Sequence, residues 1–200
     1  MSKLAIHGGT PVYDGPPPKW PHWDHRERDA LLAAFDSGEW GGFPEPNLRA
    51  GEFAEKFAAF SDATYGICCT NGSVSLELIL WALGVKAGDE VIVPAYTWVA
   101  TGAAPVHVNA VPVFVDVEPR NYCMDPAAVE AAITDRTVAI MPVHLASSVA
   151  DMDRLNAIAE KHGLAVIEDC AHAHGSRWKD KGAGSLGIAG SFSYQSSKSM

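Results

Sequence analysis

Short apolar runs alternate with longer amphipathic segments along most of this chain of 200 residues. The runs have the length and the continuous apolar character of strands buried in a parallel sheet, and they lie at residues 65–69, 90–93, 113–116, 138–141, 164–167 and 190–194. Segments typical of helices separate them, at residues 25–36, 52–60, 73–84, 99–109 and 151–162, with another that begins at Asp125-Pro126. This alternation predicts an α/β fold with a parallel-rich, doubly wound sheet.

The first two helices carry signals at their ends and on one face. Asp24 is a residue type that caps helix amino termini and Gly38 is one that ends helices, so the pair predicts a helix over residues 25–36. We expect the inner face of this helix to bury Leu31, Leu32 and Phe35. In the second helix, aromatic residues recur at helical spacing and are expected in the core; they are Phe53, Phe57 and Phe60.

The chain before Asp24 differs from the rest in composition. Residues 1–23 are rich in glycine and proline, and the prolines at 16–18 and 21 oppose both helices and sheet ladders. We therefore expect an extended leader over residues 1–23 and one domain over residues 24–200.

Composition and charge narrow the class of protein. A hydrophobic share of 48% and a charged share of 20% are typical of a globular chain, and a net charge of −9 argues against a nucleic-acid partner. No apolar run reaches the roughly 20 residues of a membrane helix, and the start lacks the apolar core of a signal peptide, so we expect a cytoplasmic protein without a membrane partner. Reduced, buried thiols are expected for the cysteines, because none has Cys-x-x-Cys spacing; they are Cys68, Cys69, Cys123 and Cys170.

Two of the predicted strands end in reactive side chains. The run at 164–167 is followed by Glu168-Asp169, and the run at 190–194 leads to Lys198. Ligands of open α/β sheets bind outside the carboxyl ends of the strands, so we expect Asp169 and Lys198 on one rim. An aldehyde cofactor with a basic ring nitrogen requires this combination, an amine for the aldehyde and a carboxylate for the ring.

An anion site is predicted near Ser73. The apolar run at 65–69 breaks at Thr70-Asn71-Gly72 and a helix follows, so free backbone N–H groups and the helix dipole could bind a phosphate. The same pattern fits a Ser-capped helix without a ligand, although the presence of Asp169 and Lys198 favours a phosphate. The turn is not a P-loop, which requires Gly-Lys-Ser/Thr at the helix start.

Two motifs carry a family resemblance. Residues 168–175 read Glu-Asp-Cys-Ala-His-Ala-His-Gly, and residues 190–198 read Gly-Ser-Phe-Ser-Tyr-Gln-Ser-Ser-Lys. From about Trp20 to Met200 the chain resembles the DegT/StrS-type sugar aminotransferases, a family of fold-type I pyridoxal-phosphate enzymes. The Ala-His-Ala-His-Gly form is most similar to the 3-amino-5-hydroxybenzoate synthase branch.

The resemblance implies pyridoxal 5'-phosphate as the cofactor and assigns residues to it. Lys198 would be the catalytic residue, which forms the Schiff base and moves a proton, and Asp169 would pair with the ring nitrogen. Trp98 would stack on the ring, and His172, which replaces a Gln of many relatives, would donate to the ring oxygen. The phosphate would be held by Ser73, the Val74 N–H and Ser193.

The resemblance also sets expectations for the whole protein. Family members continue for about as many residues again, so residues 24–200 would be an incomplete large domain, with the small carboxyl-terminal domain absent. Relatives are homodimers with shared active sites that transfer an amino group from glutamine or glutamate to a keto-sugar or keto-cyclitol. Such products belong to secondary metabolites, antibiotics among them, or to cell-surface sugars. Ala146-Ser147 stand where many relatives have Tyr-Gly, which leaves the substrate side of the pocket open.

Readings from other classes of protein remain. Asp169, Cys170, His172 and His174 could bind zinc in a hydrolase, but they lie in one short segment, and we assign no metal. A regulator that binds the cofactor without catalysis would share the fold, although Lys198 argues for an enzyme. A dinucleotide-binding oxidoreductase requires Gly-x-Gly-x-x-Gly after a strand, and residues 70–75 lack it.

Overall fold

Five parallel strands form the main sheet of the computed structural model, which describes residues 3–199. The strands are β1 (Glu90–Pro94), β2 (Val111–Val115), β3 (Thr137–Ile140), β4 (Ala165–Asp169) and β7 (Ala189–Ser191). Their order in space is β2-β1-β3-β4-β7, and every neighbouring pair is parallel. The predicted α/β class with a parallel sheet is confirmed.

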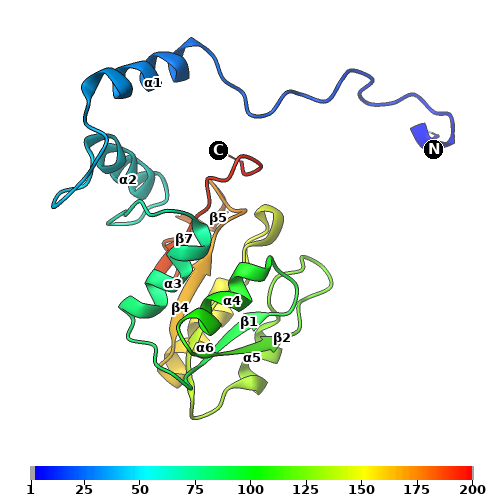
Figure 1. Cartoon of the computed structure of the whole chain (residues 1–200). Coiled ribbons are helices and arrows are strands. Elements are labelled where there is room, and N and C mark those ends of the chain that lie inside the picture. Colours follow the sequence, from blue (N-terminus) through cyan, green and yellow to red (C-terminus); the bar gives the residue numbers. More distant parts are fainter. Residues whose placement is uncertain (1–2, 200) are drawn as a thin grey trace.

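Helices cover both faces of this sheet. They are α3 (Gly72–Ala82) and α4 (Val99–His107) on one face, and α5 (Pro126–Ala132) and α6 (Met152–His162) on the other (Figure 1). Within β1, Val91 and Val93 pack with Leu80 of α3, whereas Ile92 packs with Leu155 of α6. Successive strand residues point to opposite faces, so a strand between two helical layers is apolar throughout. The doubly wound arrangement is thereby confirmed.

The first helix, α1 (His25–Ser37), forms where expected, but its apolar face is exposed. Asp24 caps it in a capping box with Glu27, and Gly38 ends it in the left-handed conformation, with φ 68°. The expected burial is wrong, because exposed fractions of 71%, 54% and 66% are found for Leu31, Leu32 and Phe35. The reason is position: α1 lies away from the sheet, so no part of the core among residues 3–199 faces it (Figure 1).

The helix α2 (Leu48–Phe60) places its aromatic residues in a cluster beside the end of β7. Phe57 is half-buried and meets Phe192 and Tyr194 edge-on, with ring centroids 4.8 and 5.4 Å away. Phe53 and Phe60 are 37% and 55% exposed. The expectation of core burial is therefore wrong for these two, since α2 packs at the last strand in the order and not on a sheet face.

The apolar run at 65–69 is not a strand. It has no regular secondary structure and pairs with no strand among residues 3–199, and Tyr65 and Ile67 are 87% and 91% exposed. An apolar run becomes a strand only when a neighbouring strand satisfies its backbone N–H and C=O groups. As a consequence Cys68 and Cys69 are exposed, contrary to expectation, whereas Cys123 and Cys170 are buried thiols as predicted.

The remaining elements are short. β5 (Arg177–Trp178) and β6 (Lys181–Gly182) form an antiparallel hairpin, and η2 (Leu145–Ser147) is a 3-10 turn. In the leader, the 3-10 turn η1 (Ala5–His7) interrupts the expected extended chain. Among residues 3–199, no helix has both the length and the apolar character that crossing a membrane would require.

The strand order determines where a ligand can bind. The chain runs from β1 to β2 on one side of β1, and then from β2 back past β1 to β3 on its other side, so the direction of winding reverses here. A crevice forms at such a switch point, outside the carboxyl ends of the strands. Because the strands are parallel, the carboxyl ends of β1, β4 and β7 lie on this same rim.

Candidate active site

Asp169, at the carboxyl end of β4, is a buried carboxylate with defined partners. It is 5% exposed, and its Oδ2 accepts a hydrogen bond from the Thr101 hydroxyl at 2.7 Å. Its Oδ1 accepts a bond from the Ala171 N–H at 3.2 Å, and Thr101 lies 2.8 Å from the Thr97 hydroxyl. These donors hold the carboxylate in one orientation, since both of its oxygens are acceptors.

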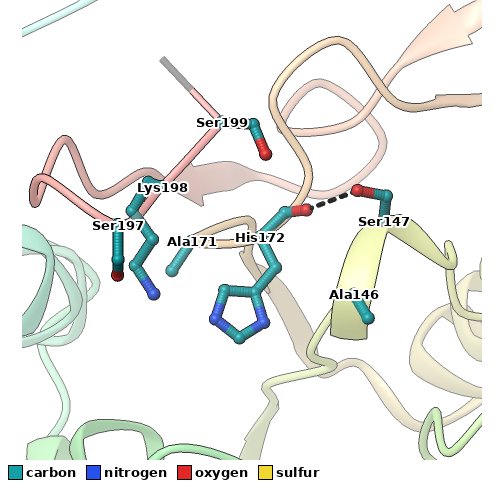
Figure 2. Close-up of a pocket in the computed structure, with 7 residues that line it drawn as sticks. All are labelled: Ala146, Ser147, Ala171, His172, Ser197, Lys198 and Ser199. Carbon is teal, nitrogen blue, oxygen red and sulfur yellow. Dashed lines mark hydrogen bonds between the residues drawn. The ribbon is translucent and has the colours of Figure 1, made fainter. Parts of the chain in front are cut away.

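Lys198 and His172 line one open cavity of about 220 Å³. Figure 2 shows the Lys198 amine and the His172 ring extending toward the same space. The backbone of His172 is fixed from the other side, because its carbonyl accepts a hydrogen bond from the Ser147 hydroxyl at 3.0 Å. The other lining residues are small: Ala146, Ala171, Ser197 and Ser199.

His172 lies in the electrostatic field of both expected active-site charges. Burial lowers the pKa of its imidazole, the positive charge of Lys198 lowers the pKa further, and the negative charge of Asp169 raises it. An imidazole with a lowered pKa is neutral near pH 7, so it can donate from one nitrogen and accept at the other. The structure thus brings together His172, Lys198 and Asp169, as the sequence predicts.

The amino terminus of α3 lies against the segment that leads to Lys198. A side chain at Gly72 would not fit, because a Cβ there would lie 2.9 Å from the Cβ of Ser193. The Ser191 hydroxyl of β7 donates to the Gly72 carbonyl at 3.2 Å. Ser193 therefore lies in contact with the start of α3, and the free N–H groups of a helix start suit an anion.

The cap of α3 differs from the expectation. Asn71, and not Ser73, caps the helix, and its side-chain oxygen accepts a hydrogen bond from the Val74 N–H at 2.9 Å. The Val74 N–H, expected to bind phosphate, is therefore engaged by the cap. The first N–H groups of a helix have no acceptor within it, so those of Gly72 and Ser73 suit a phosphate better.

Two tryptophans approach the rim from other segments. Trp98, just before α4, is 71% exposed, and its carbonyl accepts a hydrogen bond from the Thr101 N–H at 3.1 Å. The indole of Trp98 is therefore exposed, and it lies about one helical turn from Thr101, which donates a hydrogen bond to Asp169. Trp20 of the leader donates its indole N–H to the Ser196 carbonyl at 2.7 Å, two residues before Lys198.

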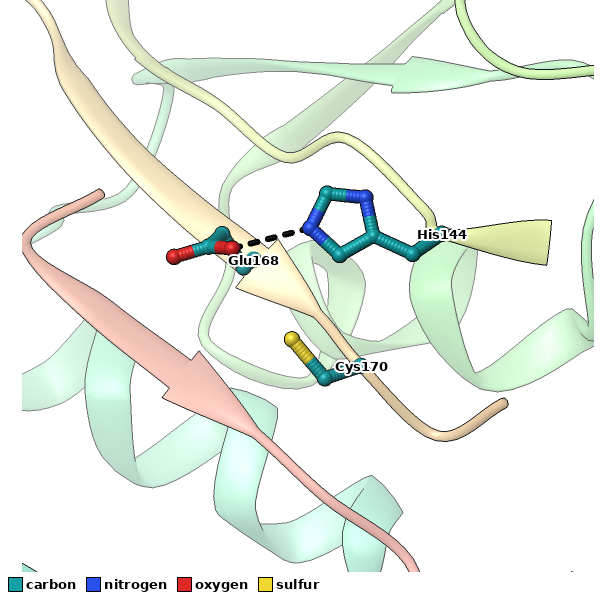
Figure 3. Close-up of side chains that lie close together, drawn as sticks. All are labelled: His144, Glu168 and Cys170. Carbon is teal, nitrogen blue, oxygen red and sulfur yellow. Dashed lines mark hydrogen bonds and ion pairs between the residues drawn. The ribbon is translucent and has the colours of Figure 1, made fainter. Parts of the chain in front are cut away.

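The potential metal ligands that converge among residues 3–199 are His144, Glu168 and Cys170 (Figure 3). Of the four residues considered for the zinc alternative, this set includes only Cys170. His144 already has protein partners at both ring nitrogens, Glu168 at 2.8 Å and the Ala150 N–H at 3.2 Å. Burial raises the pKa of the Cys170 thiol well above its ordinary value, whereas zinc binds the thiolate. This geometry gives the zinc reading no support.

Sequence reasoning missed the residues that bind Asp169 and Glu168, the two acids on β4. Thr97 precedes α4 and Thr101 lies in its first turn, so the signal available in the sequence was two hydroxyl residues beside a predicted helix start. The position of His144 after a strand can be read from the sequence, but its full burial and its bond to Glu168, 24 positions away, cannot. Such a pairing depends on strand order, so no local pattern shows it.

Known proteins resemble the chain over nearly all of its length. The model of the DegT/DnrJ/EryC1/StrS aminotransferase family matches residues 22–200. A Streptomyces kanamyceticus protein, provisionally named an L-glutamine:3-amino-2,3-dideoxy-scyllo-inosose aminotransferase, is 53% identical over 99% of this chain and 47% of its own length. The chain therefore spans about half the length of the curated relatives it matches.

Solved structures agree with this result. The crystal structure of 3-amino-5-hydroxybenzoic acid synthase matches with a TM-score of 0.86 at 42% identity, over 90% of this chain and 47% of that one. A provisionally assigned sugar aminotransferase from Streptococcus pneumoniae, in its PLP form, matches with a TM-score of 0.84 at 32% identity, over 92% and 50%. The match of residues 22–200, together with the parallel sheet, shows that the chain belongs to the DegT/DnrJ/EryC1/StrS aminotransferase family.

Proposed function

We propose that the complete protein is a pyridoxal-phosphate-dependent aminotransferase that moves the amino group of glutamine or glutamate to a keto-cyclitol or keto-sugar. The observation that carries this proposal is the convergence of Asp169, His172 and Lys198 on one rim of the sheet. A ketone of the scyllo-inosose type ranks first, because the Streptomyces kanamyceticus relative has such an acceptor and glutamine in its name. A 3-amino-5-hydroxybenzoate synthase-like activity is the alternative, which the structural likeness supports.

The residues at the rim have the chemical groups that this cofactor requires for its phosphate, its ring nitrogen and its aldehyde. The first N–H groups of α3, with Ser193 in contact with the start of that helix, would suit a phosphate. The buried carboxylate of Asp169 suits a protonated ring nitrogen, and the amine of Lys198 suits an aldehyde. The exposed indole of Trp98 would suit the face of the cofactor ring, and an N–H of His172 would suit the ring oxygen.

When bound, pyridoxal phosphate supplies a ring that withdraws electrons from a substrate carbon. Asp169, oriented by Thr101, would keep the ring nitrogen protonated through a charge-assisted hydrogen bond, a contact that contributes about 1.5–3 kcal/mol in ordinary stability terms. The Nζ of Lys198 would take a proton from the substrate carbon and deliver it to the carbonyl carbon of the cofactor. His172, neutral near pH 7, would orient the ring without adding a charge.

We also propose a homodimer with shared active sites. The family resemblance implies a phosphate ligand from a second subunit, and the exposed apolar side chains of α1 offer a surface for a partner; they are Leu31, Leu32 and Phe35. The cytoplasmic location and the division into an incomplete large domain and a separate small domain remain predictions.

Reduction with borohydride tests the cofactor assignment directly. In the complete protein, the pyridoxyl group should become attached to the peptide that contains Lys198, as located by mass spectrometry. Glutamine should also aminate a scyllo-inosose-type ketone. Lys198→Arg should abolish both results, whereas Lys181→Arg, in the exposed β5–β6 hairpin, should leave both unchanged.

Two outcomes would contradict parts of this proposal separately. A label on Lys179 or Lys181 would refute the role of Lys198. Cofactor attachment at Lys198 without amination of any keto-cyclitol or keto-sugar would retain the cofactor and favour a regulator that binds it.

A further inference from the structure

Glu168 precedes Asp169 on β4, and its side chain is fully buried. Its carboxylate accepts four hydrogen bonds, one of them from the Nε2 of His144 at 2.8 Å. The other three come from the backbone N–H groups of Gly184, Leu186 and Gly187, at 2.8, 2.7 and 2.7 Å. These lengths are typical of charge-assisted bonds. Glu168 is therefore an internal anion enclosed by donors of its own chain.

The direction of the bond from His144 follows from its other ring nitrogen. The Nδ1 of His144 accepts a hydrogen bond from the Ala150 N–H at 3.2 Å. In a neutral imidazole the second nitrogen then carries the proton, so Nε2 donates to Glu168. Both ring nitrogens are satisfied, and the ring is fully buried.

The turn at residues 184–187 is shaped to enclose Glu168. Gly184 has φ +92°, and a Cβ there would lie 2.5 Å from the ring of Phe192. A Cβ at Gly187 would overlap the carbonyl oxygen of Val166 on β4. Only glycine permits this close approach of two backbones. The turn leads directly into β7, the strand that continues to Lys198.

We propose that Glu168 is a positioning residue of the active site. By binding the turn at 184–187, its carboxylate fixes the start of β7, and hence the segment of Lys198, relative to Asp169 on β4. Glu168 does not line the cavity at Lys198, so it acts through these segments and not on a ligand. The inference rests on the proposed function in one respect, namely that Lys198 and Asp169 hold the same cofactor.

Glu168→Gln in the complete protein tests this role. Each carboxylate oxygen accepts two of the four bonds, so a Gln amide leaves two donors facing its NH₂ group whichever way it turns. We expect the backbone amides of Gly184, Leu186 and Gly187 to exchange hydrogen about tenfold faster or more. We also expect the Kd for pyridoxal phosphate to rise about tenfold or more, because Lys198 and Asp169 lose their fixed separation.

Glu90→Gln is the matched control. Glu90 is also a buried carboxylate, 4% exposed, and accepts bonds from Thr134 and Arg136 at 2.5 and 2.9 Å. It begins β1, so it lies at the end of the sheet opposite the rim. Glu90→Gln should lower stability, yet leave exchange at 184–187 and the Kd unchanged. His144→Gln, which keeps the carboxylate and its three backbone donors, should change exchange and Kd in the same direction as Glu168→Gln, but by less.

The two readouts separate failure of this inference from failure of the proposed function. If Glu168→Gln and Glu90→Gln gave the same exchange at 184–187 and the same Kd, Glu168 would be only a structural acid and the inference would be wrong. If the parent protein did not bind pyridoxal phosphate, the proposed function would fail, while amide exchange would still report on the turn. If Glu168→Gln did not fold, an unchanged exchange and Kd in His144→Gln would also contradict the inference.

Discussion

The carboxylate of Asp169 is held by its neighbours as well as by its place on β4. Thr101 donates to one oxygen and the Ala171 N–H donates to the other. Both contacts can persist in an amide, because its oxygen can accept from the Ala171 N–H while the Thr101 hydroxyl rotates to accept from its NH₂ group. The charge of this residue can therefore be removed with little change of shape.

Asp169→Asn should bind the cofactor but transfer amino groups poorly. The neutral amide cannot keep a ring nitrogen protonated, so the ring would withdraw fewer electrons from the substrate carbon as that carbon loses its proton. We expect the rate of the half-reaction with glutamine to fall by about two orders of magnitude or more. Stopped-flow absorbance of the complete protein measures this rate, and equilibrium titration measures cofactor binding.

Asp116→Asn is the control for this prediction. Asp116 follows β2 on the same rim of the sheet, but its side chain is exposed and it belongs to none of the assigned contacts. Its substitution should leave the half-reaction unchanged. Near-normal turnover in Asp169→Asn would mean that another group serves the ring nitrogen.

Helix ends give a prediction at the scale of the element. Gly163 ends α6 in the left-handed conformation, with φ +69°, and a Cβ added to it would meet no atom within 4 Å. Gly163→Ala should therefore lower the free energy of unfolding by backbone strain alone, by about 1 kcal/mol. Urea denaturation followed by circular dichroism measures the change.

Gly51→Ala should have the opposite effect. Gly51 lies inside α2, and a Cβ there also meets nothing within 4 Å. In a helix interior alanine is more favourable than glycine by about 0.5–1 kcal/mol, so the free energy of unfolding should rise. If Gly163→Ala and Gly51→Ala changed the free energy of unfolding in the same direction, backbone conformation would not be what determines stability at these two positions.

The response to acid belongs to the whole molecule, because it reflects burial produced by several segments. Burial lowers the pKa of His172 and of His174 below their ordinary value of 6.5. In the pH range between 6.5 and these lower values, the unfolded chain binds more protons than the folded one. The free energy of unfolding should therefore fall as the pH falls below about 6.5, until the folded-state pKa values are passed.

His174→Phe should make this loss of stability smaller. His174 packs against Phe57, Phe192 and Tyr194, and neither of its ring nitrogens has a hydrogen-bond partner among residues 3–199. A phenyl ring can occupy this site without a proton to bind. Urea midpoints at about pH 7.5 and about pH 5.5 measure the difference. His7→Phe, in the exposed leader, should keep the parental pH dependence. If the urea midpoint changed by the same amount between the two pH values in the parent, His174→Phe and His7→Phe, the assignment to His174 would be wrong.

Local sequence was sufficient wherever a structural choice depends on adjacent residues. The apolar runs that became β1 to β4 and β7, the cap at Asp24 and the helix end at Gly38 were all predictable, because periodicity and capping act within a few residues. The positions of Asp169 and Lys198 after two strands also followed, because parallel strands place their carboxyl ends on one rim.

Tertiary structure alone decided which apolar groups are covered and which polar groups meet. Leu31 and the run at 65–69 have the pattern of buried elements, yet Leu31, Tyr65 and Ile67 are exposed. Among residues 3–199, α1 lies away from the sheet and no strand pairs with the run. Thr101 meets Asp169 across 68 positions, and His144 meets Glu168 across 24. Local sequence was thus sufficient for the five strands of the main sheet, for most helices and for the reactive residues that follow the strands. The order of the strands determined the partners of those residues, because contacts between distant segments depend on which elements lie side by side.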